Sequence, residues 1–160
     1  MEQHTITHGA FVVERSYAHS RSKMFECFSN IDKKKSWFVD GPKNDVVSYT
    51  LDFQVGGEEK TRWKWSSGGP IEAGTLMGND TVYLDIVENS RIVLAYSMIV
   101  GNHRFSSSLL TFEFIPDGRN TTLRVTEQGA YFENSDGAEM REGGWRALLE
   151  LLGTTLDANI

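Results

Sequence analysis

The residues of this chain best suited to acid–base chemistry are His103 and Arg104, which follow Gly101-Asn102 in a predicted turn. An imidazole can accept and donate a proton near neutral pH, and a neighbouring guanidinium can stabilise a developing negative charge. Glu127 is a further candidate for a catalytic carboxylate. An exposed polar hairpin tip is the simpler interpretation of His103 and Arg104, and both interpretations stay open at this point.

Metal and nucleophile chemistry have less support. Among the four histidines, only His4 and His8 have a ligand-like spacing, and they lie in a segment without helical periodicity. The single cysteine, Cys27, shares a short predicted helix with Met24 and Phe28, an apolar setting that favours a buried and unreactive thiol. The sequence contains no zinc-protease, nucleophile-elbow, phosphate-loop or dinucleotide-binding pattern. We therefore expect no metal site, no cofactor and no dedicated nucleophile.

The composition indicates a folded chain and argues against several classes of partner. The 160 residues are 39% hydrophobic and 11% aromatic, which is too apolar for intrinsic disorder. The net charge of −6, with no basic block, argues against binding nucleic acid or an anionic membrane. No apolar run reaches the roughly 18 residues of a membrane span, and the N-terminus lacks signal-peptide features. We expect a cytoplasmic single domain over residues 1–160, with residues 1–9 as a flexible leader.

Two kinds of periodicity predict the elements that position these residues. Alternating apolar residues over 11–17 predict a strand, and Ser20 can cap a short helix over 21–29. A second short helix is expected through Lys33-Lys34-Lys35, with its lysines in solvent. Residues 45–128 then alternate in about six strands joined by short turns, which requires antiparallel pairing. Four of these predicted strands have clear limits, at 81–87, 92–100, 109–115 and 121–127.

The C-terminal segment changes to helical periodicity. Its apolar residues fall on one side of a helix of about 18 residues, and they are Trp145, Leu148, Leu149, Leu152 and Leu156. We expect Arg141 on the polar side. Gly143-Gly144 should allow close packing against the sheet, with a loosened entrance to the pocket as the alternative. A twisted sheet that curls around one helix leaves space that side chains only partly fill. The sequence thus predicts an α+β fold with a pocket between the sheet and this helix.

The residues expected to line that pocket are mostly aromatic. Aromatic side chains provide large apolar surfaces, and the polar tips of Tyr and Trp orient a ligand. For any one of these residues taken alone, a place in the core is the simpler interpretation. Arg15 is the best candidate for an inward charge, with an arginine paired at the sheet edge as the alternative. The predicted lining comprises Arg15, Trp37, Phe38, Trp63, Trp65, Tyr83, Tyr96, Phe112, Phe114, Tyr131, Trp145 and Leu149.

An ordered set of segments resembles the SRPBCC superfamily of START-like, helix-grip domains, and in particular the branch related to the C-terminal domain of the heat-shock-protein-90 ATPase activator. The resemblance covers about residues 10–157, and one departure is the extra glycine in Glu142-Gly143-Gly144-Trp145. The matching segments are residues 11–17, Trp37-Phe38, Phe53-x-x-Gly56-Gly57, 107–114, 121–129 and 142–145.

The resemblance implies a helix-grip fold with a curved antiparallel sheet of about six to seven strands wrapped around a long C-terminal helix, and two short helices after the first strand. It also implies a cavity that commonly holds apolar small molecules, but no reaction, because fold alone does not select function. We expect noncatalytic binding of a small apolar or amphipathic molecule. The alternatives are a chaperone-cofactor or stress-response interaction domain, and a cyclase, dehydratase or hydrolase using His103, Arg104, Glu127 or Tyr131. The oligomeric state is left open.

Overall fold

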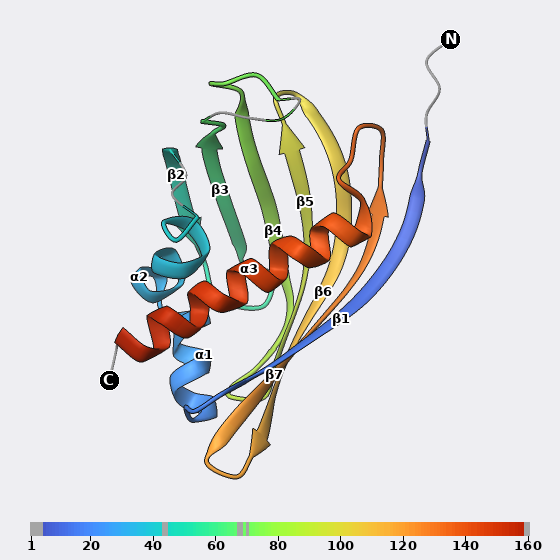
Figure 1. Cartoon of the computed structure of the whole chain (residues 1–160). Helices are drawn as coiled ribbons and strands as arrows, with labels where there is room; N and C mark the ends of the chain where they lie inside the picture. The colour runs from blue at the N-terminus through green and yellow to red at the C-terminus, as the bar shows by residue number, and fades with distance from the viewer. Residues whose placement is uncertain (1–4, 43–44, 67–68, 70, 159–160) are drawn as a thin grey trace.

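The computed structural model describes residues 5–42, 45–66, 69 and 71–158, and its centre is one curved antiparallel sheet (Figure 1). The seven strands lie in the order β1-β7-β6-β5-β4-β3-β2, which confirms the predicted architecture. Their bounds are β1 (Thr7–Tyr17), β2 (Asp45–Leu51), β3 (Glu58–Lys64), β4 (Leu76–Val87), β5 (Arg91–Val100), β6 (His103–Asp117) and β7 (Asn120–Tyr131).

Short turns connect the long central strands. The β4–β5 turn holds Asn89 at φ 59° and the β6–β7 turn holds Gly118 at φ 61°. Asparagine and glycine adopt this left-handed backbone at the least steric cost, so both hairpins are encoded locally. Strand β6 extends further than alternation predicts, and His103 and Arg104 are its first two residues rather than part of the turn.

The first strand also begins earlier than the sequence predicts. β1 starts at Thr7 and pairs with β7 over its whole length, from Thr7 opposite Tyr131 to Tyr17 opposite Thr121. Residues 7–9 therefore belong to the sheet and not to a leader, because their backbone groups complete the pairing with β7. The prediction for residues 1–4 lies outside the described residues.

Three short helical segments follow β1: α1 (Arg21–Ser29), α2 (Ile31–Lys34) and η1 (Lys35–Val39). The Ser20 hydroxyl caps α1 by accepting from the Lys23 amide at 3.3 Å, as predicted. Asn30 caps α2 through the Lys33 amide at 3.1 Å. The last segment, η1, is a π-helical turn, a conformation that occurs frequently at functional sites.

The long helix α3 (Gly137–Ala158) crosses the concave face of the sheet (Figure 1). The predicted apolar stripe is confirmed, because Trp145, Leu149, Leu152 and Leu156 are all buried. The Tyr17 hydroxyl donates to the Leu149 carbonyl oxygen at 2.7 Å and so ties β1 to the middle of α3. Apolar contact along this stripe provides most of the stability of the helix on the sheet.

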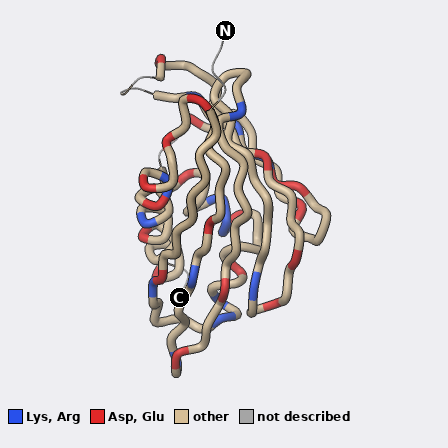
Figure 2. The backbone as a smooth tube through the Cα atoms, turned by 90° about the vertical axis from the view of Figure 1, so that its right-hand side faces the viewer, with Lys and Arg blue, Asp and Glu red and all other residues tan. Residues whose placement is uncertain are grey.

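Charged residues of both signs are interspersed along the described backbone (Figure 2). The net charge of the chain is −6. Among the described residues, no helix combines the length and the apolar character needed to cross a membrane.

Candidate ligand-binding cavity

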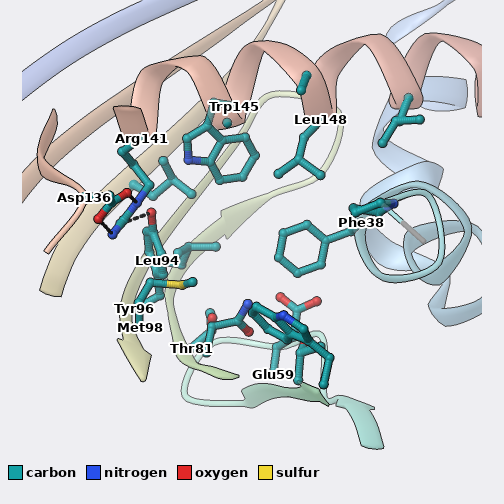
Figure 3. A pocket seen from close by; sticks show the side chains of 18 of the residues that line it. Phe38, Glu59, Thr81, Leu94, Tyr96, Met98, Asp136, Arg141, Trp145 and Leu148 are labelled. Atoms are coloured by element: carbon teal, nitrogen blue, oxygen red, sulfur yellow. Dashed lines mark hydrogen bonds and ion pairs between the residues drawn. The ribbon is translucent and has the colours of Figure 1, made fainter. Parts of the chain in front are cut away.

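A cavity of about 470 Å³ lies between α3 and the inner face of strands β3 to β6. Figure 3 shows Phe38 and Trp145 facing this space from different elements, with Leu148 above it and Glu59 and Thr81 on the side of the sheet. The volume lies in the range of small-molecule sites in proteins. Most of the wall is apolar, and its apolar residues include Phe38, Trp63, Trp65, Leu94, Met98, Leu110, Phe112, Trp145, Leu148 and Leu151.

The exposed side of α3 forms part of the cavity's edge. Gly144 and Ala147 line the cavity and are exposed to solvent, as is Met140. A Cβ atom placed on Gly143 or Gly144 would meet nothing within 4 Å. Of the two expectations for these glycines, close packing against the sheet is wrong, because α3 turns this stretch toward solvent. At Gly144 the absence of a side chain instead keeps the cavity's edge open.

A buried carboxylate lies behind the wall at one end of the cavity. Glu127 of β7 is 0% exposed. Its Oε2 accepts from the Tyr131 hydroxyl at 2.8 Å and from the Ser108 hydroxyl at 3.2 Å. Its Oε1 accepts from the Trp145 indole at 3.1 Å and from the Tyr96 hydroxyl. Because a carboxylate offers about four lone-pair sites, these donors leave Glu127 without a free position for a substrate proton.

Arg141 of α3 completes this cluster. Its Nε and Nη2 both donate to the Asp136 carboxylate at 2.8 Å, a bidentate geometry that is strong for such pairs. Nη2 also donates to the Ser106 hydroxyl at 2.8 Å, and Nη1 lies 3.4 Å from Glu127 Oε2. Burial favours the neutral form, but the hydrogen bonds and charges around Arg141 outweigh it and raise its pKa. Burial raises the pKa of Tyr96, so the Tyr96 phenol stays protonated and donates.

The expectation that Arg141 faces solvent on the polar side of α3 is wrong. Only 8% of the residue is exposed, because the cavity end of the sheet presents Glu127 to it. From the sequence alone, an arginine on a predicted helix gives no indication that a buried carboxylate of another element pairs with it.

A second buried carboxylate lies on the opposite side of the cavity. Glu59 of β3 accepts from the Tyr49 hydroxyl at 2.6 Å and from the Tyr83 hydroxyl at 2.9 Å. The Lys34 ammonium lies 3.3 Å from Glu59 Oε2 and 4.6 Å from the centre of the Phe38 ring. Burial, followed by the charge of Glu59, raises the pKa of both tyrosines. Lys34 is 3% exposed, so its prediction as a solvated lysine is wrong.

The sheet register connects the two carboxylate clusters. Glu59 lies opposite Thr81, and Thr81 lies opposite Tyr96. In the next row, Thr61 lies opposite Asn79. Alternation along β3 and β4 directs these side chains to the inner face, so a polar strip crosses the floor of an otherwise apolar cavity.

The cavity brings together about half of the residues predicted to line it. The predicted residues that do line it are Phe38, Trp63, Trp65, Tyr96, Phe112 and Trp145. Those that are buried in the core outside the lining are Trp37, Tyr83, Phe114, Tyr131 and Leu149.

Arg15 lies outside the lining and is exposed. Its strand β1 is at the edge of the sheet. The Arg15 guanidinium instead lies 5.7 Å from the ring centre of Tyr17.

The predicted acid–base candidates do not meet at the cavity. The His103 imidazole Nε2 lies 2.8 Å from the Glu133 carbonyl oxygen, and Arg104 pairs with Asp80 at 3.2 Å. Neither His103 nor Arg104 is among the lining residues. Burial raises the pKa of the Cys27 thiol to about 11, so the thiol is protonated and unreactive at neutral pH. The described residues contain no group of His, Cys, Asp and Glu arranged to hold a metal ion.

Sequence reasoning missed the charged, hydroxyl and amide residues of the lining: Lys34, Glu59, Thr61, Asn79, Thr81, Asp136 and Arg141. Alternation could have found the strand residues, because Asn79 and Thr81 share a face of β4 with Met77 and Tyr83. No comparable signal exists for Lys34 or Arg141.

A family model described as "Activator of Hsp90 ATPase homolog 1-like protein" matches residues 18–157. The chain belongs to this family. The Mll3558 protein from Rhizobium loti is 39% identical, has a TM-score of 0.83, and is aligned over 94% of this chain and 99% of its own. An uncharacterized protein from Rhizobium leguminosarum is 29% identical, with a TM-score of 0.90 and coverage of 98% and 99%.

The fold also occurs in more distant proteins. DynU16, a protein in the dynemicin biosynthetic locus, is 14% identical with a TM-score of 0.65, and the alignment covers 94% of this chain and 48% of that one. At this identity the likeness shows the helix-grip fold alone. No functionally curated protein matches the chain.

Proposed function

We propose that the protein binds one small apolar or amphipathic molecule in the cavity between the sheet and α3. The observation that carries this proposal is a cavity of about 470 Å³ whose wall combines indole and phenyl rings with a few polar groups. Binding sites for small molecules have this composition, in which the apolar wall supplies affinity and the polar groups fix orientation. Membership of a family whose fold forms such a cavity supports the same function.

Binding without catalysis fits the state of the ionisable groups. Among the described lining residues, Lys34 is engaged by Glu59, and Arg141 by Asp136. A general acid or base needs a position from which it can reach the substrate proton. Groups that are saturated by one another stabilise the walls of the cavity and are poorly placed for proton transfer.

The test compares tryptophan substitutions at two adjacent glycines of α3. Gly144 lines the cavity and Gly143 does not, while neither has a neighbour within 4 Å of an added Cβ. We expect Gly144→Trp to abolish binding of the neutral fluorescent probe N-phenyl-1-naphthylamine, because the indole would occupy the cavity. Gly143→Trp should bind the probe as the parent does, and circular dichroism should show that both variants are folded. Equal binding by Gly144→Trp and the parent would contradict the proposal.

Native mass spectrometry provides an independent measurement. We expect freshly purified protein to carry an additional noncovalent mass that is absent from the denatured sample, and expect Gly144→Trp to lack it. The mass difference would identify the bound class of molecule and would report the oligomeric state in the same spectrum.

A chaperone-cofactor function is the second candidate, and the family match over residues 18–157 favours it. The expected result is that adding the protein changes the ATPase rate of an Hsp90-type chaperone. The cavity variant Gly144→Trp would separate the two functions, because it should stop ligand binding and leave a surface interaction unchanged. An unchanged ATPase rate at saturating protein would exclude this candidate.

A further inference from the structure

Two buried oxygens in the cavity floor have no hydrogen-bond partner within the described part of the chain. Among the residues the structure describes, Thr61 Oγ1 and Asn79 Oδ1 are buried side-chain polar atoms without one. Thr61 is 3% exposed and Asn79 is 7% exposed, and both line the cavity. Buried polar groups in folded proteins are almost always satisfied, so an unsatisfied pair in a binding cavity points to a group supplied from outside the chain.

The two atoms are placed to contact the same group. Thr61 and Asn79 lie directly opposite each other on β3 and β4, an arrangement that brings Cβ atoms to about 5 Å from each other. Both side chains are on the inner face, where Glu59 and Thr81 form the adjacent row. One small polar group above this pair can therefore reach both oxygens.

The types of the two atoms define the chemistry of that group. The carboxamide oxygen of Asn79 only accepts hydrogen bonds, whereas the Thr61 hydroxyl both donates and accepts. A hydroxyl group satisfies the pair, because it can donate its proton to Asn79 Oδ1 and accept the proton of Thr61. A carboxylate has no proton for Asn79 and would place its charge against the amide oxygen.

The surrounding charges favour a neutral ligand. Among the described lining residues, the cations Lys34 and Arg141 are already paired with Glu59 and Asp136. A carboxylate ligand would therefore lose its hydration without gaining a free cation, and an ammonium would find Glu59 occupied by other donors.

We propose that the ligand is a neutral, hydroxyl-bearing apolar molecule whose hydroxyl binds between Thr61 and Asn79. This inference rests on the proposed binding function. The apolar body of the ligand lies against Phe112 and Trp145, which line the cavity with the pair. The polar pair thus selects among apolar molecules of similar size by the group they carry.

The experiment compares probes that differ only in this group. The probes are 2-(hydroxymethyl)naphthalene, its near-isostere 2-ethylnaphthalene, 2-naphthoate and protonated 2-(aminomethyl)naphthalene, each measured by displacement of N-phenyl-1-naphthylamine. The alcohol should bind about tenfold more tightly than the ethyl compound, since each net hydrogen bond contributes up to about a factor of ten. Both charged probes should bind more weakly than the alcohol.

Matched variants assign the preference to the pair. Thr61→Val and Asn79→Leu keep the approximate volume and remove the polar atoms, so each should abolish the preference for the alcohol while 2-ethylnaphthalene binds at least as tightly as before. Thr111→Val, on the outer face of β6, is the control and should keep the preference.

The outcomes separate the two proposals. Equal affinity for the alcohol and the ethyl compound would overturn the hydroxyl inference, as expected if water alone occupies the pair, and would leave the binding function intact. A preference for naphthoate, or a preference that persists in Thr61→Val and Asn79→Leu, would also overturn it. If the alcohol does not displace N-phenyl-1-naphthylamine, the hydroxyl inference alone fails. If N-phenyl-1-naphthylamine itself does not bind the parent, or if Gly144→Trp binds it as the parent does, the binding function fails and the hydroxyl inference fails with it.

Discussion

Two regions on the concave face of the same sheet differ in whether their buried polar groups have hydrogen-bond partners among the described residues. On what we call the closed side, around Glu127 and Arg141, the carboxylate and the guanidinium are surrounded by donors and acceptors from β5, β6, β7 and α3. On the open side, around Thr61 and Asn79, two buried oxygens have no partner from the described chain. The polar side chains on the open side are buried nearly as completely as those on the closed side. The two sides therefore differ in whether these groups have hydrogen-bond partners, and not in how exposed they are.

This difference indicates that the two sides of the sheet have different roles. α3 packs on β1 and covers the closed side, while the cavity separates it from β3 and β4. Saturated polar clusters specify a unique packing and resist change, whereas unsatisfied groups are costly unless something binds them. The closed side therefore holds the helix in place, and the open side is where we propose that a second molecule binds.

The largest expected effect is a difference in stability between alanine substitutions of two tryptophans. Trp145→Ala should destabilise the protein by about 3–5 kcal/mol, because a buried indole that donates to Glu127 is lost from the closed side. Trp63→Ala, at a half-buried position on the open side, should cost about 1–2 kcal/mol. Urea unfolding followed by circular dichroism measures both. A loss below about 1 kcal/mol for Trp145→Ala would mean that the helix does not grip the sheet at this position.

The second-largest effect is expected when the buried carboxylate of Glu127 is replaced. Glu127→Gln should cost about 2–3 kcal/mol, since the amide nitrogen cannot accept from the tyrosine, serine and indole donors. The control is Glu14→Gln on β1, whose exposed carboxylate pairs with Arg124 at 2.6 Å and should contribute less than about 1 kcal/mol. Equal effects of the two substitutions in urea titrations would contradict the distinction between the closed side and the surface.

Two glycines should respond with opposite signs. At Gly129, on the closed side, an added Cβ would lie 2.7 Å from the Tyr131 ring, and that ring is held by its hydrogen bond to Glu127. We expect Gly129→Ala to destabilise the protein by about 1–3 kcal/mol. Gly144→Ala should stabilise it by about 0.5–1 kcal/mol, because alanine favours the helix and meets no neighbour. Thermal unfolding of both variants would test this, and a shift of the same sign would refute it.

The smallest effect concerns the unsatisfied pair in the protein without ligand. Asn79→Leu should raise the free energy of unfolding by about 1 kcal/mol, because it removes a buried amide oxygen that has no partner. This sign is opposite to that of Glu127→Gln. A clear decrease in the midpoint of thermal unfolding would show that Asn79 is satisfied, and the two sides would then be alike.

The sequence predicts the scaffold well because local patterns determine it. The apolar stripe of α3 and the Ser20 cap are visible from spacing and residue type alone, and the structure confirms both. Short turns such as the one at Asn89 require antiparallel neighbours, so the order of β4 to β7 also follows from local features. The pairing of β1 with β7 joins strands that are distant in the sequence and has no such local signal.

The cavity is less predictable because its polar residues depend on distant partners. Lys34 and Arg141 are charged, as surface residues usually are. Their partners Glu59 and Glu127 lie on other elements and come close to them only in the folded chain. Trp37 and Phe38 are neighbours in the sequence, yet the π-helical turn directs Trp37 to the core, where it donates to the Cys27 carbonyl oxygen, and Phe38 to the cavity. Residue type suggests that both rings are inside but does not distinguish their surroundings.

The bare stretch of α3 at Gly143 and Gly144 has an evolutionary consequence. A side chain acquired at Gly144 would narrow the cavity without disturbing the packing beneath the helix, since an added Cβ there meets nothing within 4 Å. Under the proposed binding function, a single substitution at this position would therefore change which molecules fit the cavity while the fold stays the same. Under the same proposal, descendants of one ancestral chain would diverge in ligand preference by single substitutions at the edge of the cavity, before any change in the core.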